Sequence, residues 1–230
     1  MGIAVAAVIF DFNGTLSDDE PLLAELFTEL AAEQLGLEIS HESYLETLAG
    51  LSDPEIAARL AGMAGRDDAS GSLASRLLVS KISAYRRRVE VEPRITPEAS
   101  SFVRAVAARV PVALVTGAVH EEVDTALQAA GIGDLFAAVV AGDDTRRGKP
   151  DPEGLLLAQA QLGLPAAGGV VVFEDSAAGL EAVRAAGMRG VKVGTDQLER
   201  AEGLYERIIP RLGMEEGAWL LQLLPGAGKG

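Results

Sequence analysis

The stretch Asp11-Phe12-Asn13-Gly14-Thr15-Leu16 follows directly on an apolar run at residues 3–10. Uniformly apolar runs of this length are typical of strands that are covered on both faces of a parallel sheet. A carboxylate at the end of such a strand costs free energy unless it has a bound partner. The pattern therefore predicts a buried strand at 3–10, a tight turn through Asn13-Gly14, and a functional acid at Asp11.

A second apolar run, at residues 169–173, also ends in acids, Glu174 and Asp175. The carboxyl ends of neighbouring parallel strands meet at one edge of a sheet, where ligands of such folds gather. Magnesium prefers oxygen ligands. We expect Asp11 and Asp175 to bind Mg²⁺, with the backbone carbonyl of Asn13 as a third ligand.

The composition limits the classes of function. A chain of 230 residues with a net charge of −14 forms one large domain or two small ones, and its charge argues against nucleic-acid and membrane-surface partners. With no cysteine and only two histidines, the chain has no disulfide framework, no thiol nucleophile and no multi-histidine metal site. No apolar run approaches the ~18 residues of a membrane span, and the apolar start lacks the basic region of a signal peptide. We expect a cytoplasmic protein.

Strand-like and helical segments alternate along most of the chain. The pattern is typical of a doubly wound α/β fold with a parallel, Rossmann-like sheet. The predicted strands are 3–10, 111–115, 136–140, 169–173 and 190–193, and the predicted helices between them are about 98–109, 120–130, 151–162 and 176–186.

Residues 21–91 interrupt this alternation with an all-helical pattern. Helices are predicted near 21–35, 41–49, 53–63 and 72–90. We interpret the segment as a helical cap domain inserted into a catalytic core made of residues 1–20 and 92–230. A cap on two short linkers is expected to close like a lid; a single rigid domain with a helical excursion is the alternative.

Two further strand ends carry groups that suit a phosphoryl ligand. Thr116-Gly117 follows one predicted strand, and Lys149 lies in the loop after the next. Phosphoryl transfer depends on positioning and on neutralisation of charge, and a carboxylate such as Asp11 can act as the nucleophile. We predict Asp11, Asn13, Thr116 and Lys149 as catalytic residues, with Thr116, Gly117 and Lys149 binding phosphate.

At this point the chain resembles the haloacid dehalogenase superfamily, and more narrowly the branch of β-phosphoglucomutase and phosphoglycolate phosphatase. The resemblance covers nearly the whole chain and implies an α/β core with a helical cap. It is carried by four motifs in order: Asp11-Phe12-Asn13-Gly14-Thr15-Leu16, Val115-Thr116-Gly117, Gly148-Lys149-Pro150-Asp151-Pro152 and Phe173-Glu174-Asp175-Ser176.

The resemblance implies a role for each matching residue. Asp11 is implied as nucleophile and Mg²⁺ ligand, and Thr116 and Lys149 as phosphate binders. Asp175 is implied as a metal ligand. Glu174 is implied as a ligand or as an acceptor for metal-bound water.

Asn13 departs from the family pattern. Phosphatases of this family carry there an aspartate that protonates the leaving oxygen and then activates water. Such acid–base assistance is worth ~10²–10⁴-fold in rate, and an amide cannot supply it. Four interpretations stay open: a slow or selective phosphatase, a cap residue that replaces the missing acid, a change introduced to trap a complex, and a weakly catalytic protein that binds a phosphorylated ligand.

Cap residues bear on other activities of the superfamily. Phosphonate-cleaving members use a cap lysine, and Lys81 is the only lysine between residues 21 and 91. The pattern of residues 77–89 instead favours a solvated helix face for Lys81. Asp53 stands where the mutase has an arginine for a second phosphate, which argues against mutase activity. We expect Asp53 to be a helix N-cap before Pro54.

The sequence therefore predicts a Mg²⁺-dependent phosphatase that acts on a small phosphorylated metabolite through an aspartyl-phosphate on Asp11. We expect a monomer or homodimer. The alternatives are a weakly catalytic phospho-ligand-binding protein, or a relative that cleaves phosphonates or transfers phosphate within a sugar. His120 is expected in the first turn of the helix that follows Thr116-Gly117.

Overall fold

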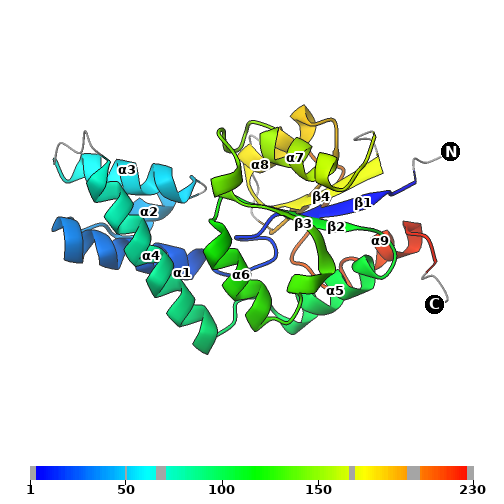
Figure 1. The fold of residues 1–230 in the computed structure, drawn as a ribbon, viewed down its shortest axis with the longest axis horizontal. Helices are drawn as coiled ribbons and strands as arrows, with labels where there is room; N and C mark the ends of the chain where they lie inside the picture. The colour runs from blue at the N-terminus through cyan, green and yellow to red at the C-terminus, as the bar shows by residue number, and fades with distance from the viewer. Residues whose placement is uncertain (1–3, 50, 66–70, 166–168, 196–202, 227–230) are drawn as a thin grey trace. The chain divides into compact units, whose positions relative to one another are not determined.

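The structure is a computed structural model that describes residues 4–49, 51–65, 71–165, 169–195 and 203–226 (Figure 1). The chain divides into two compact units. One contains Met1–Asp18 and Ile95–Gly230, and we call it the sheet unit. The other contains Asp19–Arg94, and we call it the helical unit.

The sheet unit is built on a parallel sheet whose six strands, within the described residues, lie in the order β3-β2-β1-β4-β5-β6. The strands are β1 Ala7–Phe10, β2 Val112–Val115, β3 Phe136–Val140, β4 Val170–Glu174, β5 Arg189–Val193 and β6 Arg207–Ile209. The chain runs outward from β1 to β3 and then restarts at β4 on the other side of β1. This reversal places the switch point of the fold, where ligands of such sheets bind, between β1 and β4.

Helices cover both faces of the sheet, as expected for a doubly wound fold (Figure 1). Figure 1 shows α7 and α8 on one face, and α5, α6 and α9 on the other. Their bounds are α5 Pro97–Ala107, α6 His120–Ala129, α7 Glu153–Gln161, α8 Ala177–Ala185 and α9 Ala218–Leu223. Short 3₁₀ turns lie at Gly133–Leu135 and Gly142–Asp144. The predicted fold class is confirmed, and each predicted strand and helix of this unit is present. The short elements β6 and α9 were not predicted.

The central strands are apolar because both of their faces are covered. Every residue of β1 and β2 is buried, and Ile9 lies in register with Ala113 on β2 and Val172 on β4. The rings of Phe10 and Phe173 stack at 5.3 Å between centroids. This packing holds the carboxyl ends of β1 and β4 side by side.

The helical unit has a hydrophobic core of its own. Its elements are α1 Glu20–Leu30, a π-helical turn at Ala31–Leu35, α2 His41–Thr47, α3 Asp53–Met63 and α4 Ser72–Val91. Buried side chains such as Phe27, Tyr44, Leu60 and Leu77 belong to that core. Gly36, with a φ of 67°, ends the first helical stretch in the left-handed conformation that favours glycine.

The prediction that Lys81 lies on a solvated helix face is wrong. The buried residues of α4 recur every four positions, through Leu77, Lys81 and Tyr85, so that Lys81 falls on the apolar stripe of the helix. Its side chain is fully buried, and Nζ lies 2.7 Å from Asp53 Oδ2. The ammonium also lies 5.6 Å from the centre of the Phe27 ring.

The prediction that Asp53 caps α3 is also wrong. Ser52 is the N-cap, and Glu55 Oε2 accepts hydrogen bonds from the Ser52 backbone N–H at 3.1 Å and from its hydroxyl at 2.7 Å. Asp53 is the first residue of the helix. Because Ser52 and Glu55 satisfy the helix start, the Asp53 carboxylate remains available to pair with Lys81.

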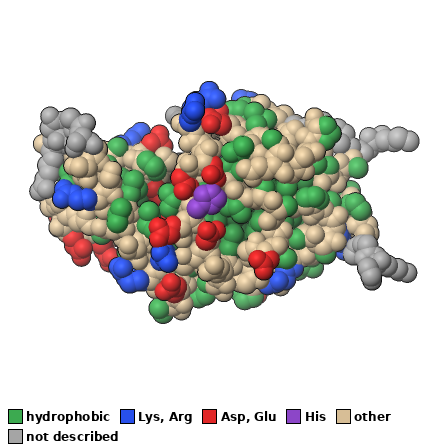
Figure 2. All heavy atoms as spheres, viewed as in Figure 1, with side chains coloured by type: hydrophobic (Ala, Val, Ile, Leu, Met, Phe, Trp, Pro, Cys, Tyr) green, Lys and Arg blue, Asp and Glu red, His purple; other side chains and the backbone are tan. Residues whose placement is uncertain are grey.

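Charged side chains of both signs are interspersed on the face shown in Figure 2. Among the helices of the described residues, none combines the length and the apolar character that a bilayer crossing requires.

Candidate active site

The loop after β1 places Asp11 at the edge of the sheet. The Asp11 backbone N–H donates to Phe173 O at 2.9 Å, which continues the pairing with β4 past the end of the strand. The backbone N–H groups of Leu16 and Ser17 both donate to Phe12 O at 2.9 Å, and this closes the loop tightly. Asp11 is buried, so its carboxylate is held by the strand and the turn together.

The loop after β1 contacts the end of β4 through a glycine and a threonine. A Cβ atom at Gly14 would lie 2.3 Å from Asp175 Oδ2, and the φ of Gly14 is 73°. The Thr15 hydroxyl donates to Asp175 Oδ1 at 3.2 Å. Glycine is therefore required at position 14, both by the close approach of Asp175 and by the backbone conformation.

Three carboxylates from the two strand ends form one group. One oxygen each of Asp11, Glu174 and Asp175 lies within 4.8 Å of the others. This set of oxygen atoms suits a hard divalent cation. The structure thus brings together the acids that the sequence placed at separate strand ends.

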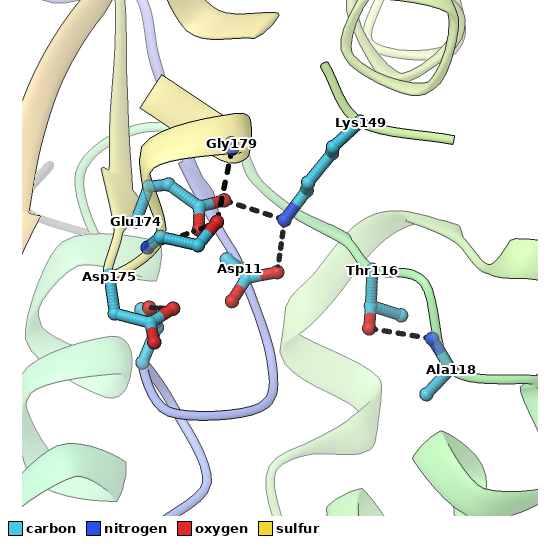
Figure 3. Close-up of polar contacts among 9 residues, drawn as sticks. Asp11, Thr116, Ala118, Lys149, Glu174, Asp175 and Gly179 are labelled. Carbon is cyan, nitrogen blue, oxygen red and sulfur yellow. Dashed lines mark hydrogen bonds and ion pairs between the residues drawn. The ribbon is translucent and has the colours of Figure 1, made fainter. Parts of the chain in front are cut away.

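Lys149 points into this carboxylate group (Figure 3). Its Nζ lies 2.5 Å from Glu174 Oε2 and also contacts Asp11 Oδ1. Burial, and then the charge of Glu174, raise the pKa of Asp11 from its ordinary value to about 7, while Lys149 acts in the opposite direction. Burial disfavours the charged ammonium, but the attraction of Asp11 and Glu174 raises the pKa of Lys149 overall.

Glu174 is held by its own neighbours as well as by Lys149. Its Oε1 accepts hydrogen bonds from the Ser176 backbone N–H at 2.9 Å and from the Ser176 hydroxyl at 2.8 Å. The same hydroxyl accepts from the Gly179 N–H at 3.0 Å and so caps α8. Both oxygens of Glu174 are engaged, which suits a residue that orients Lys149. The sequence did not predict that Ser176 holds Glu174 in place.

Thr116 lies on the other side of Asp11 from Asp175 (Figure 3). Its hydroxyl accepts a hydrogen bond from the Ala118 N–H at 3.0 Å, and its own N–H donates to Val140 O at 3.0 Å. The carbonyl of Gly117 packs against Gly142, where a Cβ atom would lie only 2.3 Å from it. The loop after β2 is therefore fixed by the loop after β3.

His120 begins α6, as predicted. Its Nε2 lies 2.7 Å from Asp144 Oδ2, and its backbone N–H donates to Asp143 Oδ1 at 3.2 Å. These contacts join the start of α6 to the 3₁₀ turn after β3. Asn13 is half-buried in the loop after β1 and forms a bridge with Ser17.

Four strand ends thus direct carboxylates, an ammonium and a hydroxyl toward one edge of the sheet, and comparison with known proteins identifies the family. Residues 5–187 match the haloacid dehalogenase-like hydrolases. The chain belongs to this family.

Named relatives and a solved structure agree with this assignment. The chain is 30% identical over 200 residues to the phosphorylated carbohydrates phosphatase of Thermotoga maritima, which covers 87% of this chain and 90% of that protein. It is 32% identical over 185 residues to the phosphoglycolate phosphatase of Yersinia pseudotuberculosis, covering 80% and 78%. The β-phosphoglucomutase of Clostridium difficile shares its fold with a TM-score of 0.80 at 22% identity, covering 95% and 96%. The predicted family, its branch and an enzyme of the hydrolase class are confirmed.

Proposed function

We propose that this haloacid dehalogenase-like hydrolase is a Mg²⁺-dependent phosphatase of a small phosphorylated metabolite, with Asp11 as the nucleophile. The observation that carries the proposal is the carboxylate group of Asp11, Glu174 and Asp175 around the ammonium of Lys149. A fixed carboxylate beside a cationic side chain can attack phosphorus and form an aspartyl-phosphate.

The residues present fit a divalent cation. The three grouped carboxylates offer only oxygen atoms, and Asp175 is packed directly against Gly14. We propose Asp11 and Asp175 as side-chain ligands and the Asn13 carbonyl as a further ligand. Glu174 acts beside them, as a ligand or as an acceptor for metal-bound water. When bound, Mg²⁺ supplies positive charge that stabilises the phosphoryl oxygens during transfer.

The chain's own residues supply the remaining charge and orientation. Lys149 holds an ammonium beside the attacking oxygen of Asp11, where it neutralises negative charge that develops on the phosphoryl group. The Thr116 hydroxyl and the backbone N–H groups near Gly117 supply hydrogen bonds to the same group. Ser176 keeps Glu174 in the position from which Glu174 holds Lys149.

The substrate class follows from the site and from the relatives together. Two of the relatives are named for phosphorylated carbohydrates and for phosphoglycolate. Phosphate monoesters of small hydroxylated metabolites therefore form the first set to test. Asn13 cannot transfer a proton, so esters whose leaving group needs little protonation should react fastest.

Asn13 also favours a second candidate, a protein that binds a phosphorylated ligand with little turnover. The Schiff-base route through Lys81 has no comparable support, because that lysine is buried and ion-paired with Asp53 inside the helical unit. Position 53, where the mutase has an arginine for a second phosphate group, here holds an acid that is paired with Lys81.

A screen of phosphate esters and acyl phosphates with Mg²⁺ tests the proposal. Asp11→Asn should abolish phosphate release, whereas Asp124→Asn, a change of the same kind at an exposed position on α6, should not. Acid quenching during turnover should leave phosphate on the peptide that contains Asp11. Equal turnover by the Asp11→Asn protein would refute the proposal.

Calorimetry separates the second candidate from the first. Tight Mg²⁺-dependent binding of a phosphate ester that the protein does not hydrolyse favours the binding protein. Titration of Mg²⁺ alone, compared with an Asp175→Asn variant, tests the cation site without any need for activity.

A further inference from the structure

Asn13 is the only asparagine among the 230 residues of the chain, and a glycine follows it. Asparagine followed by glycine is the sequence in which the side-chain amide is chemically least stable. Because glycine has no side chain, its backbone nitrogen can approach the preceding Asn Cγ with little hindrance. The one asparagine of this chain therefore stands in the most reactive context, two residues after Asp11.

The packing of the site fixes this context. Any side chain at position 14 would place its Cβ atom 2.3 Å from Asp175 Oδ2, and the backbone there has a φ of 73°. Glycine at 14 is thus a requirement of the carboxylate group, independent of what precedes it. The residue at 13 therefore precedes an obligatory glycine, and an amide there has the neighbour that permits cyclisation.

We propose that Asn13 is a self-modification site whose conversion to aspartate switches the enzyme to a faster form. The backbone nitrogen of Gly14 loses its proton and bonds to Cγ of Asn13, and the bond from Cγ to the amide nitrogen breaks and releases ammonia. Water then opens the resulting succinimide ring and leaves either aspartate or isoaspartate at position 13. The net change is the addition of one water molecule and the loss of one ammonia molecule.

This inference rests on the proposed function, because it assigns the new carboxyl group a task in phosphate transfer. A carboxyl at position 13 lies in the same tight loop as Asp11 and can carry the proton that an amide cannot. General acid–base assistance of this kind is worth ~10²–10⁴-fold in rate. A minor fraction of molecules that carry aspartate at position 13 therefore accounts for most of the measured activity.

The folded loop restrains the reaction. The Gly14 N–H donates to Ser17 O at 2.9 Å, and Ser17 is fully buried. The attacking nitrogen is thus engaged in a hydrogen bond that must open before the ring closes. Conversion should be slower in the native protein than in the unfolded chain, and the opening of this loop sets its rate.

Incubation of the purified protein at neutral pH, with samples taken over weeks, tests the inference. Peptide mapping by mass spectrometry follows the amide, aspartate and isoaspartate forms of the peptide that contains residue 13. A parallel sample in guanidinium provides the unfolded reference. Phosphate release is measured on the same native samples, beside Asn13→Asp, which represents full conversion, and Asn13→Gln, whose longer side chain closes the ring far more slowly.

We expect phosphate release by the native protein to rise in proportion to the aspartate fraction and to reach at most the rate of Asn13→Asp. The rate of Asn13→Gln should not change over the same incubation. An amide that persists in the native protein overturns the inference, and an active Asn13→Asp protein then leaves the proposed function intact. Conversion to aspartate without a gain in activity also overturns it. If Asn13→Asp and the unmodified protein both fail to hydrolyse any phosphate ester, the proposed function fails instead.

Discussion

The ammonium of Lys149 lies 2.5 Å from Glu174 Oε2 and contacts Asp11 Oδ1 as well. One cation thus joins the acids at the ends of two adjacent strands, β1 and β4. The Lys149 side chain retains 21% of its exposed surface, whereas those of Asp11 and Glu174 retain 8% and 2%. Loss of the cation leaves two buried carboxylates close together without compensation.

Lys149→Met should therefore lower both activity and stability. Loss of one partner from a buried charged group costs roughly 3 kcal/mol, and phosphate release should fall to the level of Asp11→Asn. Arg147→Met is the matched control, because Arg147 pairs with Asp151 and Glu153 but is 69% exposed. The control should change the free energy of unfolding by less than about 1 kcal/mol. Equal losses in the free energy of unfolding for Lys149→Met and Arg147→Met, measured by urea titration, would contradict the proposed role of Lys149 in pairing with Asp11 and Glu174.

Asn13→Asp should accelerate some substrates far more than others. A carboxyl at position 13 can protonate a leaving oxygen, and alkyl phosphates need that proton more than aryl or acyl phosphates do. We expect a gain of about 10²-fold or more in kcat/KM for alkyl phosphates and a much smaller gain for the others. A uniform gain across the three classes would show that Asn13 limits some other step.

Gly14→Ala should destabilise the protein for two separable reasons. The new Cβ atom meets Asp175 Oδ2, and the backbone is left-handed. Gly163→Ala isolates the second cause, because Gly163 has a φ of 67° and nothing within 4 Å of its Cβ position. The control should cost about 1 kcal/mol, and Gly14→Ala clearly more by thermal unfolding. Similar costs would mean that Asp175 moves away freely.

Glu20 should make the stability of the protein depend on pH. Burial, then the charges of Asp19 and Asp53, raise the pKa of Glu20 to about 7, while Lys81 lowers it. The unfolded chain titrates near the ordinary value of 4.5, so the folded state binds more protons between these two values. The free energy of unfolding should therefore fall as the pH rises from about 4.5 to about 7.

Glu20→Gln removes this contribution. Between about pH 4.5 and about pH 7.5, the free energy of unfolding of the wild-type protein should fall by on the order of 1–2 kcal/mol more than that of the variant. Glu90→Gln, at an exposed position on α4, should retain the wild-type slope. Parallel curves for wild type and Glu20→Gln in urea titrations would show that Glu20 does not hold its proton.

Sequence alone was sufficient for the sheet and for the acids at its edge. Parallel strands covered on both faces are uniformly apolar, so runs such as 169–173 stand out, and the strand-end rule then places Asp11 near Asp175. The three-residue strand β6, with Arg207 at its start, has no such pattern. The aspartyl-phosphate, the metal and the site roles of Thr116 and Lys149 remain predictions.

The rest depends on partners that are distant in the sequence. The pattern of residues 77–89 predicted a solvated helix face for Lys81, whereas its spacing from Leu77 and Tyr85 places it on the buried stripe of α4. Its partner Asp53 is 28 residues away, and no local pattern reveals that pair. The close approach of Gly14 to Asp175 is likewise visible only in the structure, because no sequence pattern links the two residues.

The hydrogen bond from Thr15 to Asp175 joins residues 160 positions apart. During synthesis on the ribosome, Asp11 emerges long before β4, the strand that completes its surroundings. A nascent chain that is released before β4 is made lacks Glu174 and Asp175, the acids that lie beside Asp11. Premature termination upstream of residue 170 should therefore yield a chain in which the carboxylate group of Asp11, Glu174 and Asp175 cannot form, and we expect such a chain to release no phosphate.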